Sequence, residues 1–94
     1  MDKKKLRYAI LKEIDTGNEE INEKDFGVTP KEFDNALEFL SREGYLKGVK
    51  GADGRKWCFA GFVKITEKGE QYLDDNSALK KTYNGLKEIR DWIK

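Results

Sequence analysis

The start of a helix at Thr29-Pro30-Lys31-Glu32 constrains the fold of this chain more than any other feature. Thr29 supplies a hydroxyl that can cap the helix, Pro30 suits its first position, and the Glu32 carboxylate can reach back to the cap. The apolar residues that follow recur with helical spacing, at Phe33, Ala36, Leu37 and Leu40. The sequence therefore predicts a helix over residues 30–43.

Two further helices are expected before this one. Leu6, Ile10 and Ile14 share one face of a predicted helix over residues 3–14. A shorter helix is predicted over residues 21–26, and Gly27-Val28-Thr29 predicts a tight turn in which the glycine takes a positive φ. The first half of the chain is therefore expected to be a unit of three helices, the third following a tight turn.

After Gly44 the helical spacing gives way to aromatic and β-branched residues, which predicts strands over residues 45–50 and 57–66. Asp53-Gly54, between the two strands, is a residue pair that favours a hairpin turn. Alternation along the second strand places Trp57 and Phe59 on one face and Phe62 on the other. We therefore expect this strand to be covered on both faces.

The remaining residues predict two more helices. Thr66 is expected to cap a short one, and Ser77 is expected to cap a last one that is kinked at Asn84-Gly85. The apolar residues of the last helix are expected either to pack on the first helix of the same chain or to form a homodimer seam, through Leu79, Tyr83, Leu86, Ile93 and, off the stripe, Trp92.

This order of elements predicts an α+β fold, a winged helix-turn-helix with a three-helix core, a β-hairpin wing and C-terminal helices. The capped third helix is the recognition helix of such a fold. Residues 1–76 are expected to form the winged-helix domain, and residues 77–94 a C-terminal helix packed on that domain or at a dimer seam.

Four runs of sequence also have a familiar pattern: LRYAILKEI at residues 6–14, residues 27–48, ITEKGEQYL at residues 65–73 and KEIRDWIK at residues 87–94. In these runs, which together extend over nearly the whole chain, the sequence resembles the YjcQ-like family of small proteins from Gram-positive bacteria and their prophages. The resemblance implies a winged-helix fold, with DNA binding suspected from that fold. It carries no biochemical activity and no site residue over to this chain.

Residues that suit DNA contacts lie on the predicted recognition helix. Side chains of Arg, Lys, Asn and Gln read base edges in the major groove, and Lys31 and Asn35 lie on the exposed face near the end that enters first. Arg42, at the far end, is expected to reach only the DNA backbone. The alternative is an ordinary solvated helix face, on which Asp34, Glu38 and the nearby Glu19, Glu20 and Glu23 would repel phosphates.

A second basic group, Lys50, Arg55 and Lys56, is expected at the wing tip. Winged-helix proteins commonly contact the sugar-phosphate backbone there, which makes binding salt-dependent. Lys3, Lys4 and Lys5 are expected to add a flexible basic arm. The alternative is that hairpin tips and chain ends are charged for solubility.

The net charge of +1 conceals a strong local pattern. Residues 1–12 and 45–64 each carry a net charge of +4, whereas residues 13–44 contain ten carboxylates against three basic side chains, a net charge of −7. A partner meets this local field rather than the total. The acidic block supports an alternative function, a winged-helix protein-interaction module that docks a basic protein partner on the surface of residues 13–44.

Other classes of function find no support in the sequence. Cys58 is the single cysteine, so no internal disulfide can form, and a reducing, cytoplasmic location is expected. Without histidine, the chain also has too few of the usual ligands for a zinc site. No apolar run approaches the ~20 residues that span a bilayer. No nucleophile elbow or phosphate-binding loop occurs, so we expect no enzyme, catalytic residue, metal or cofactor. The sequence predicts a DNA-binding transcriptional regulator associated with phages or prophages.

Overall fold

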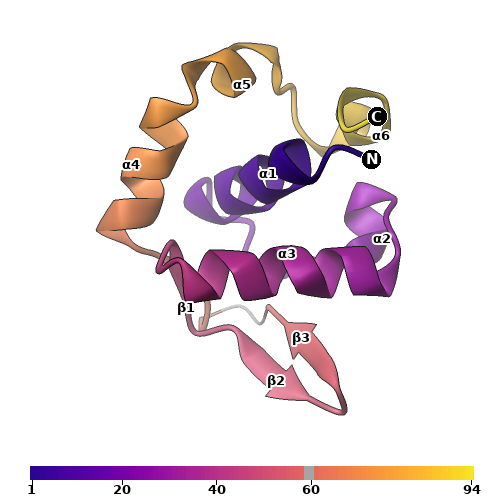
Figure 1. Cartoon of the computed structure of the whole chain (residues 1–94), viewed down its shortest axis with the longest axis vertical. Helices are drawn as coiled ribbons and strands as arrows, with labels where there is room; N and C mark the ends of the chain where they lie inside the picture. The colour runs from indigo at the N-terminus through magenta and orange to yellow at the C-terminus, as the bar shows by residue number, and fades with distance from the viewer. Residues whose placement is uncertain (59–60) are drawn as a thin grey trace.

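The computed structural model describes residues 1–58 and 61–94, and it has the α+β winged helix-turn-helix fold that the sequence predicts (Figure 1). In the described residues, three helices are followed by four short strands, and these by three α-helices and one 3₁₀ helix. The elements are α1 Lys3–Asp15, α2 Glu23–Phe26, α3 Pro30–Arg42, β1 Leu46–Lys47, β2 Lys50–Ala52, β3 Arg55–Trp57, β4 Lys64–Ile65, α4 Glu67–Asp75, α5 Ser77–Thr82, η1 Leu86–Glu88 and α6 Ile89–Trp92.

The predicted start of α3 is confirmed in atomic detail. The Thr29 hydroxyl oxygen accepts a hydrogen bond from the Glu32 N–H at 3.1 Å, and the Glu32 carboxylate accepts one from the Thr29 N–H at 2.9 Å. Gly27, which ends α2, has the left-handed conformation expected of the turn, with φ of 67°. These local bonds set where α3 begins and in which direction it leaves α2.

Helix α1 begins at Lys3, so the basic residues at the start of the chain are helical. The Asp2 carboxylate caps the helix by accepting hydrogen bonds from the N–H groups of Lys4 and Lys5 at 2.9 and 3.1 Å. The expectation of a flexible basic arm at residues 3–5 is therefore wrong, because these lysines form the first turn of α1. Lys5 Nζ also donates to the Trp92 carbonyl oxygen at 3.0 Å, which ties α1 to the end of the chain.

The hydrophobic core surrounds α1. Figure 1 shows α3 on one side of α1, with α4 and α5 curving around another side. The predicted stripe of α1 is confirmed, since Leu6, Ile10 and Ile14 are all buried. The buried residues that complete the core come from most of the other elements and include Phe26, Phe33, Leu37, Leu40, Leu46, Val63, Leu73, Ile89 and Ile93. This packing leaves the opposite face of α3 outside the core.

The wing is built from two short ladders in place of two long strands. Strand β1 pairs antiparallel with β4 at the base, and β2 pairs antiparallel with β3 towards the tip. The hairpin turn at Asp53-Gly54 is confirmed, because both residues have positive φ, 54° and 74°, as a type I′ turn requires. The predicted continuous strands over 45–50 and 57–66 are wrong, because each is interrupted between the two ladders.

Two glycines explain the interruption. Gly48 and Gly61 have φ of 85° and 87°, outside the conformational region of a β-strand. Phe62, expected to be covered, is 58% exposed beside this break. The predicted positions of Phe59 and Ala60 lie outside the described residues.

The C-terminal segment is a series of short helices rather than one kinked helix. Helix α5 begins after Asn76, so the expected cap at Ser77 is wrong. The helix ends at Thr82, and the backbone of the next residue, Tyr83, is extended. Gly85 follows with φ of 94°, a conformation that a continuous helix cannot contain. Gly85 therefore breaks the helix where a kink was expected.

The residues expected at a homodimer seam contact the chain's own core. Ile93 is buried, and Leu79, Tyr83, Leu86 and Trp92 are half-buried against the same cluster. The Trp92 ring lies 5.0 Å from the ring centre of Tyr83, and its indole N–H donates to the Thr82 hydroxyl at 2.8 Å. The homodimer seam stays a prediction, which light scattering across a concentration series would test.

Candidate nucleic-acid interface

An open groove of about 400 Å³ separates the outer face of α3 from the tip of the wing. It contains four of the six residues expected to bind DNA, two on α3 and two on β3, and carboxylates lie among them. The groove is lined by Pro30, Lys31, Asp34, Asn35, Glu38, Gly54, Arg55 and Lys56. Helix α3 and the hairpin thus present their polar side chains to one shared space.

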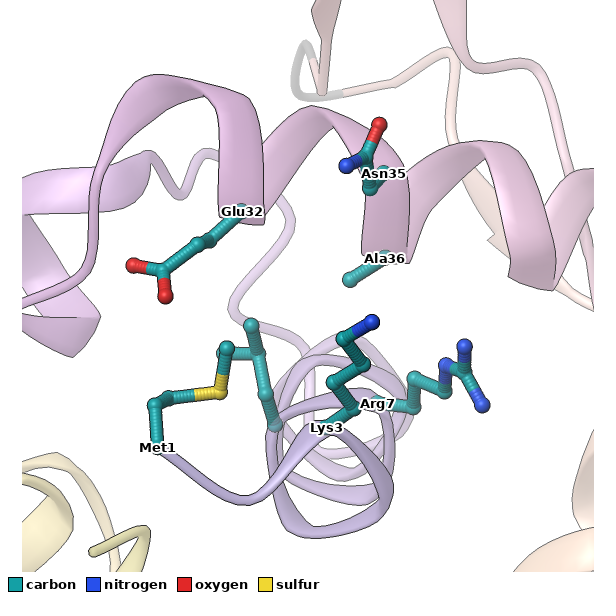
Figure 2. A pocket seen from close by; sticks show the side chains of 7 residues that line it. Met1, Lys3, Arg7, Glu32, Asn35 and Ala36 are labelled. Carbon is teal, nitrogen blue, oxygen red and sulfur yellow. The ribbon is translucent and has the colours of Figure 1, made fainter.

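Lys31 and Asn35 lie one helical turn apart on the exposed face of α3, as predicted. Asn35 also borders a second, smaller pocket of about 100 Å³, on the side of α3 that faces the start of α1. Figure 2 shows Glu32, Asn35 and Ala36 on α3 opposite Met1, Lys3 and Arg7. The exposed face of α3 is therefore bordered by the wing on one side and by basic residues of α1 on the other.

Arg55 is held by carboxylates instead of projecting freely from the wing. Its Nε donates to Asp34 Oδ2 at 2.6 Å, and its Nη2 donates to Asp34 Oδ1 at 3.3 Å and to Glu23 Oε1 at 3.3 Å. We call this group of Arg55, Asp34 and Glu23 the wing clamp. It joins β3 to both α2 and α3. The phosphate contact expected of Arg55 stays a prediction, and in this structure the guanidinium is paired with two carboxylates.

The other predicted cations have different surroundings. Lys56 is half-buried in the groove, whereas Lys50 is exposed and its Nζ lies 5.1 Å from the ring centre of Phe62. Arg42, at the C-terminal end of α3, is exposed, and its Nε lies 3.9 Å from a Glu43 carboxylate oxygen. The structure therefore gathers Lys31, Asn35 and Lys56 at the groove, and Lys50 and Arg42 lie outside its lining.

Comparison with known proteins agrees with this architecture. Residues 4–92 match the family described as YjcQ protein. The chain belongs to the YjcQ family. It is 52% identical over 94 residues to the "Uncharacterized protein YjcQ" of Bacillus subtilis (strain 168), with 100% of both chains covered. It is also similar to the solution NMR structure of the YjcQ protein from Bacillus subtilis, with a TM-score of 0.73 and 48% sequence identity over 85% of this chain and 97% of that one. The expected family is confirmed.

Many carboxylates of the acidic block in this YjcQ-family chain are used internally. Asp25 and Glu32 cap α2 and α3, and Glu23 and Asp34 belong to the wing clamp. The Glu13 carboxylate accepts a hydrogen bond from the Tyr83 hydroxyl at 2.5 Å. The sum of −7 therefore overstates the free negative charge of this surface.

The remaining observations on the described residues concern metal ligands, the cysteine and membrane spans. Within residues 1–58 and 61–94, no cluster of three or more His, Cys, Asp or Glu side chains is placed to hold a metal ion. Burial raises the pKa of the Cys58 thiol to about 12, so the thiol is protonated at neutral pH. In the same part of the chain, no helix has the length and apolar character needed to cross a bilayer.

Sequence reasoning missed the wing clamp. It treated Asp34 and Glu23 as charges that repel phosphate, and Arg55 as a charge that attracts it. Arg55 lies 21 residues from Asp34 and 32 residues from Glu23 along the chain. No local pattern links residues so far apart, so only the folded structure could pair them.

Proposed function

We propose that this chain is a DNA-binding winged-helix protein and acts as a transcriptional regulator associated with phages or prophages. Helix α3 would enter the major groove, and the wing would lie along the backbone. The observation that carries the proposal is the uncovered Lys31 and Asn35 face of α3, which borders an open groove with Lys56 across it. B-form DNA has a major groove ~12 Å wide, which admits one α-helix.

The chemistry of this face suits base edges. Asn35 can form a paired hydrogen bond with adenine, and Lys31 can donate to guanine. Glu38, one turn further along α3, can accept a hydrogen bond from the amino group of cytosine. These side chains can therefore select bases, while exposed cations beside them bind phosphates without regard to sequence.

The wing clamp supports the proposal in two ways. It sets the position of the wing relative to α3, so that Lys56 stays opposite Lys31 and Asn35 without a conformational search. It also pairs Asp34, which would otherwise repel phosphate beside the recognition face. Lys50 and Arg42, both exposed, are the candidates for further phosphate contacts.

A fluorescence anisotropy titration with a labelled DNA duplex at ~50 mM salt tests the proposal. Lys31→Ala and Asn35→Ala are expected to weaken specific binding roughly 5- to 100-fold each, the range of one good base contact. Lys56→Ala is expected to weaken binding to every sequence and to reduce the salt slope by about 0.9. The matched control is Lys81→Ala on α5, which is exposed and outside the groove. Undetectable binding to any duplex at this low salt would end the proposal.

The alternative proposal is a protein-interaction module that docks a basic protein through residues 13–44. The observation that favours it is that Asp15, Glu20 and Glu38 are exposed, and none has an ion-pair partner among the described residues. A nuclease-treated host extract should then yield one stoichiometric basic protein, and the triple variant Asp15→Asn, Glu20→Gln, Glu38→Gln should lose it. Recovery of nucleic acid alone would count against this module.

A further inference from the structure

We propose that this chain has a second binding site, a polar cavity of about 170 Å³ between α1, α4 and α5 that takes a small zwitterion of the α-amino-acid class. The residues that would bind it are Tyr8, Lys12 and Asp15 of α1, Glu70 and Asp74 of α4, and Lys80 of α5. None of these residues lines the groove between α3 and the wing. The inference is therefore independent of the proposed function in DNA binding.

The first observation is an unpartnered buried hydroxyl. Tyr8 is 0% exposed, and its hydroxyl oxygen has no hydrogen-bond partner among the described residues. Its neighbour Tyr83, by contrast, donates to Glu13 at 2.5 Å. Burying a hydroxyl without a partner is costly, and native proteins satisfy nearly all such groups with protein atoms, water or a ligand. A water molecule or a ligand from outside the chain would therefore satisfy the Tyr8 hydroxyl.

Tyr8 contributes to the lining of the cavity. Burial raises the pKa of Tyr8, and the nearby carboxylates of Asp15 and Asp74 raise it further. Both acidic residues line the same cavity as Tyr8, and their effect on its pKa shows that the hydroxyl lies near them.

The second observation is that charges of both signs meet here without pairing. Lys12 and Lys80 bring two ammonium groups, and Asp15, Glu70 and Asp74 bring three carboxylates. Across residues 1–58 and 61–94, no ion pair within 4.0 Å involves any of these five side chains. Opposite charges that share a cavity but stay apart leave room for a group between them that can contact both.

This arrangement selects the chemistry of the ligand. A zwitterion places its ammonium near Asp15 and Asp74 and its carboxylate near Lys12 and Lys80. The Tyr8 hydroxyl can donate a hydrogen bond to the carboxylate or accept one from the ammonium. The two lysines would repel a diamine, and the three carboxylates would repel a dicarboxylate. The cavity has space for several water molecules, at ~30 Å³ each in the liquid, or for one compact amino acid.

An NMR titration of the ¹⁵N-labelled full chain tests the site, with L-alanine as the probe and 1,4-diaminobutane and succinate as probes that each carry charge of one sign. L-Alanine is expected to give saturable shifts at the amides of Tyr8, Glu70 and Lys80, with an apparent affinity at least about tenfold higher than that of either comparison probe. The inference is overturned if no saturable shift occurs up to ~50 mM L-alanine. It is also overturned if the diamine or the dicarboxylate binds as well as L-alanine.

Matched variants locate the binding. Lys80→Gln and Tyr8→Phe are each expected to weaken L-alanine binding about tenfold or more, because each loses a hydrogen bond to a charged group. Lys81→Gln, an exposed neighbour on α5 that does not line the cavity, is expected to stay within about twofold of the parent chain. Equal effects of Lys80→Gln and Lys81→Gln would show general charge attraction and refute the site. The amide spectrum of Tyr8→Phe checks that it remains folded.

Discussion

The wing clamp makes a quantitative prediction for Arg55→Met, which keeps most of the aliphatic length and removes the charge. The Arg55 side chain is 27% exposed, and the Asp34 and Glu23 side chains are 15% exposed. An exposed ion pair contributes ~0–1 kcal/mol, and breaking a fully buried one costs ~3–5 kcal/mol. The clamp lies between these limits, so we expect Arg55→Met to lower the free energy of unfolding by about 2 kcal/mol.

The measurement is urea unfolding followed by tryptophan fluorescence. Trp57 is a local reporter, because the Arg55 guanidinium lies 5.0 Å from its ring centre. Lys56→Met is the matched control, since Lys56 is the next residue of β3, is also half-buried and has no ion pair among the described residues. The loss of stability should appear as a lower midpoint with an unchanged denaturant slope, because the same surface is exposed on unfolding.

A double-mutant cycle identifies the cause. If Arg55 acts through Asp34, then Asp34→Asn should cost at least ~1 kcal/mol less in the Arg55→Met background than in the parent chain. Arg55→Lys should recover only part of the stability, because lysine cannot form the two-point contact with one carboxylate. The reasoning is refuted if Arg55→Met and Lys56→Met agree within ~0.5 kcal/mol, or if the cycle shows no coupling.

Three other predictions concern the wing, the thiol and an internal tyrosine. Gly48→Ala should lower the free energy of unfolding, measured by thermal unfolding, by more than ~3 kcal/mol, because its Cβ would lie 1.8 Å from the Phe62 carbonyl oxygen at a φ of 85°. The control is Gly17→Ala, where φ is 100° and no atom lies within 4 Å, and which should lower it by only ~1–2 kcal/mol. Cys58 should react with a thiol reagent at pH ~8 only as fast as the chain opens, because its pKa is about 12, and rapid labelling of the folded chain would contradict this. Burial and the Glu13 carboxylate raise the pKa of Tyr83 above its usual range. Above pH ~10 only the unfolded chain loses the Tyr83 hydroxyl proton, so the free energy of unfolding should fall as pH rises. A urea midpoint that stays constant between pH ~9 and ~11 would contradict this.

Local signals made much of the fold predictable. The cap at Thr29 and the turns at Gly27 and Asp53-Gly54 depend on atoms within a few residues, so the sequence revealed them directly. The wing ladders and the C-terminal helix were harder to predict. Both predictions failed where Gly48, Gly61 and Gly85 take a positive φ. The sequence does not reveal the sign of φ at a glycine, because glycine adopts either sign.

The candidate interface was predictable only in part. Lys31 and Asn35 were expected on the outer face of α3 because helical spacing places them opposite the apolar stripe, and they lie there. The surroundings of Arg55 were not predictable in this way. A charged side chain at the wing tip pairs with whichever carboxylates the fold brings near it, and here these come from α2 and α3.

Taken alone, the amino-acid sequence determined the three helices of the first half of the chain, where α3 starts and which residues of α1 and α3 face the core. These properties follow from interactions over three or four residues and from the burial of apolar stripes. Only the tertiary structure decided that Arg55 is paired with Asp34 and Glu23 and that the buried Tyr8 lies beside a cavity lined by charged residues. The physical reason is that the energy of a charge or a buried hydroxyl depends on the atoms within a few ångströms of it, and in a folded chain those atoms come from distant residues.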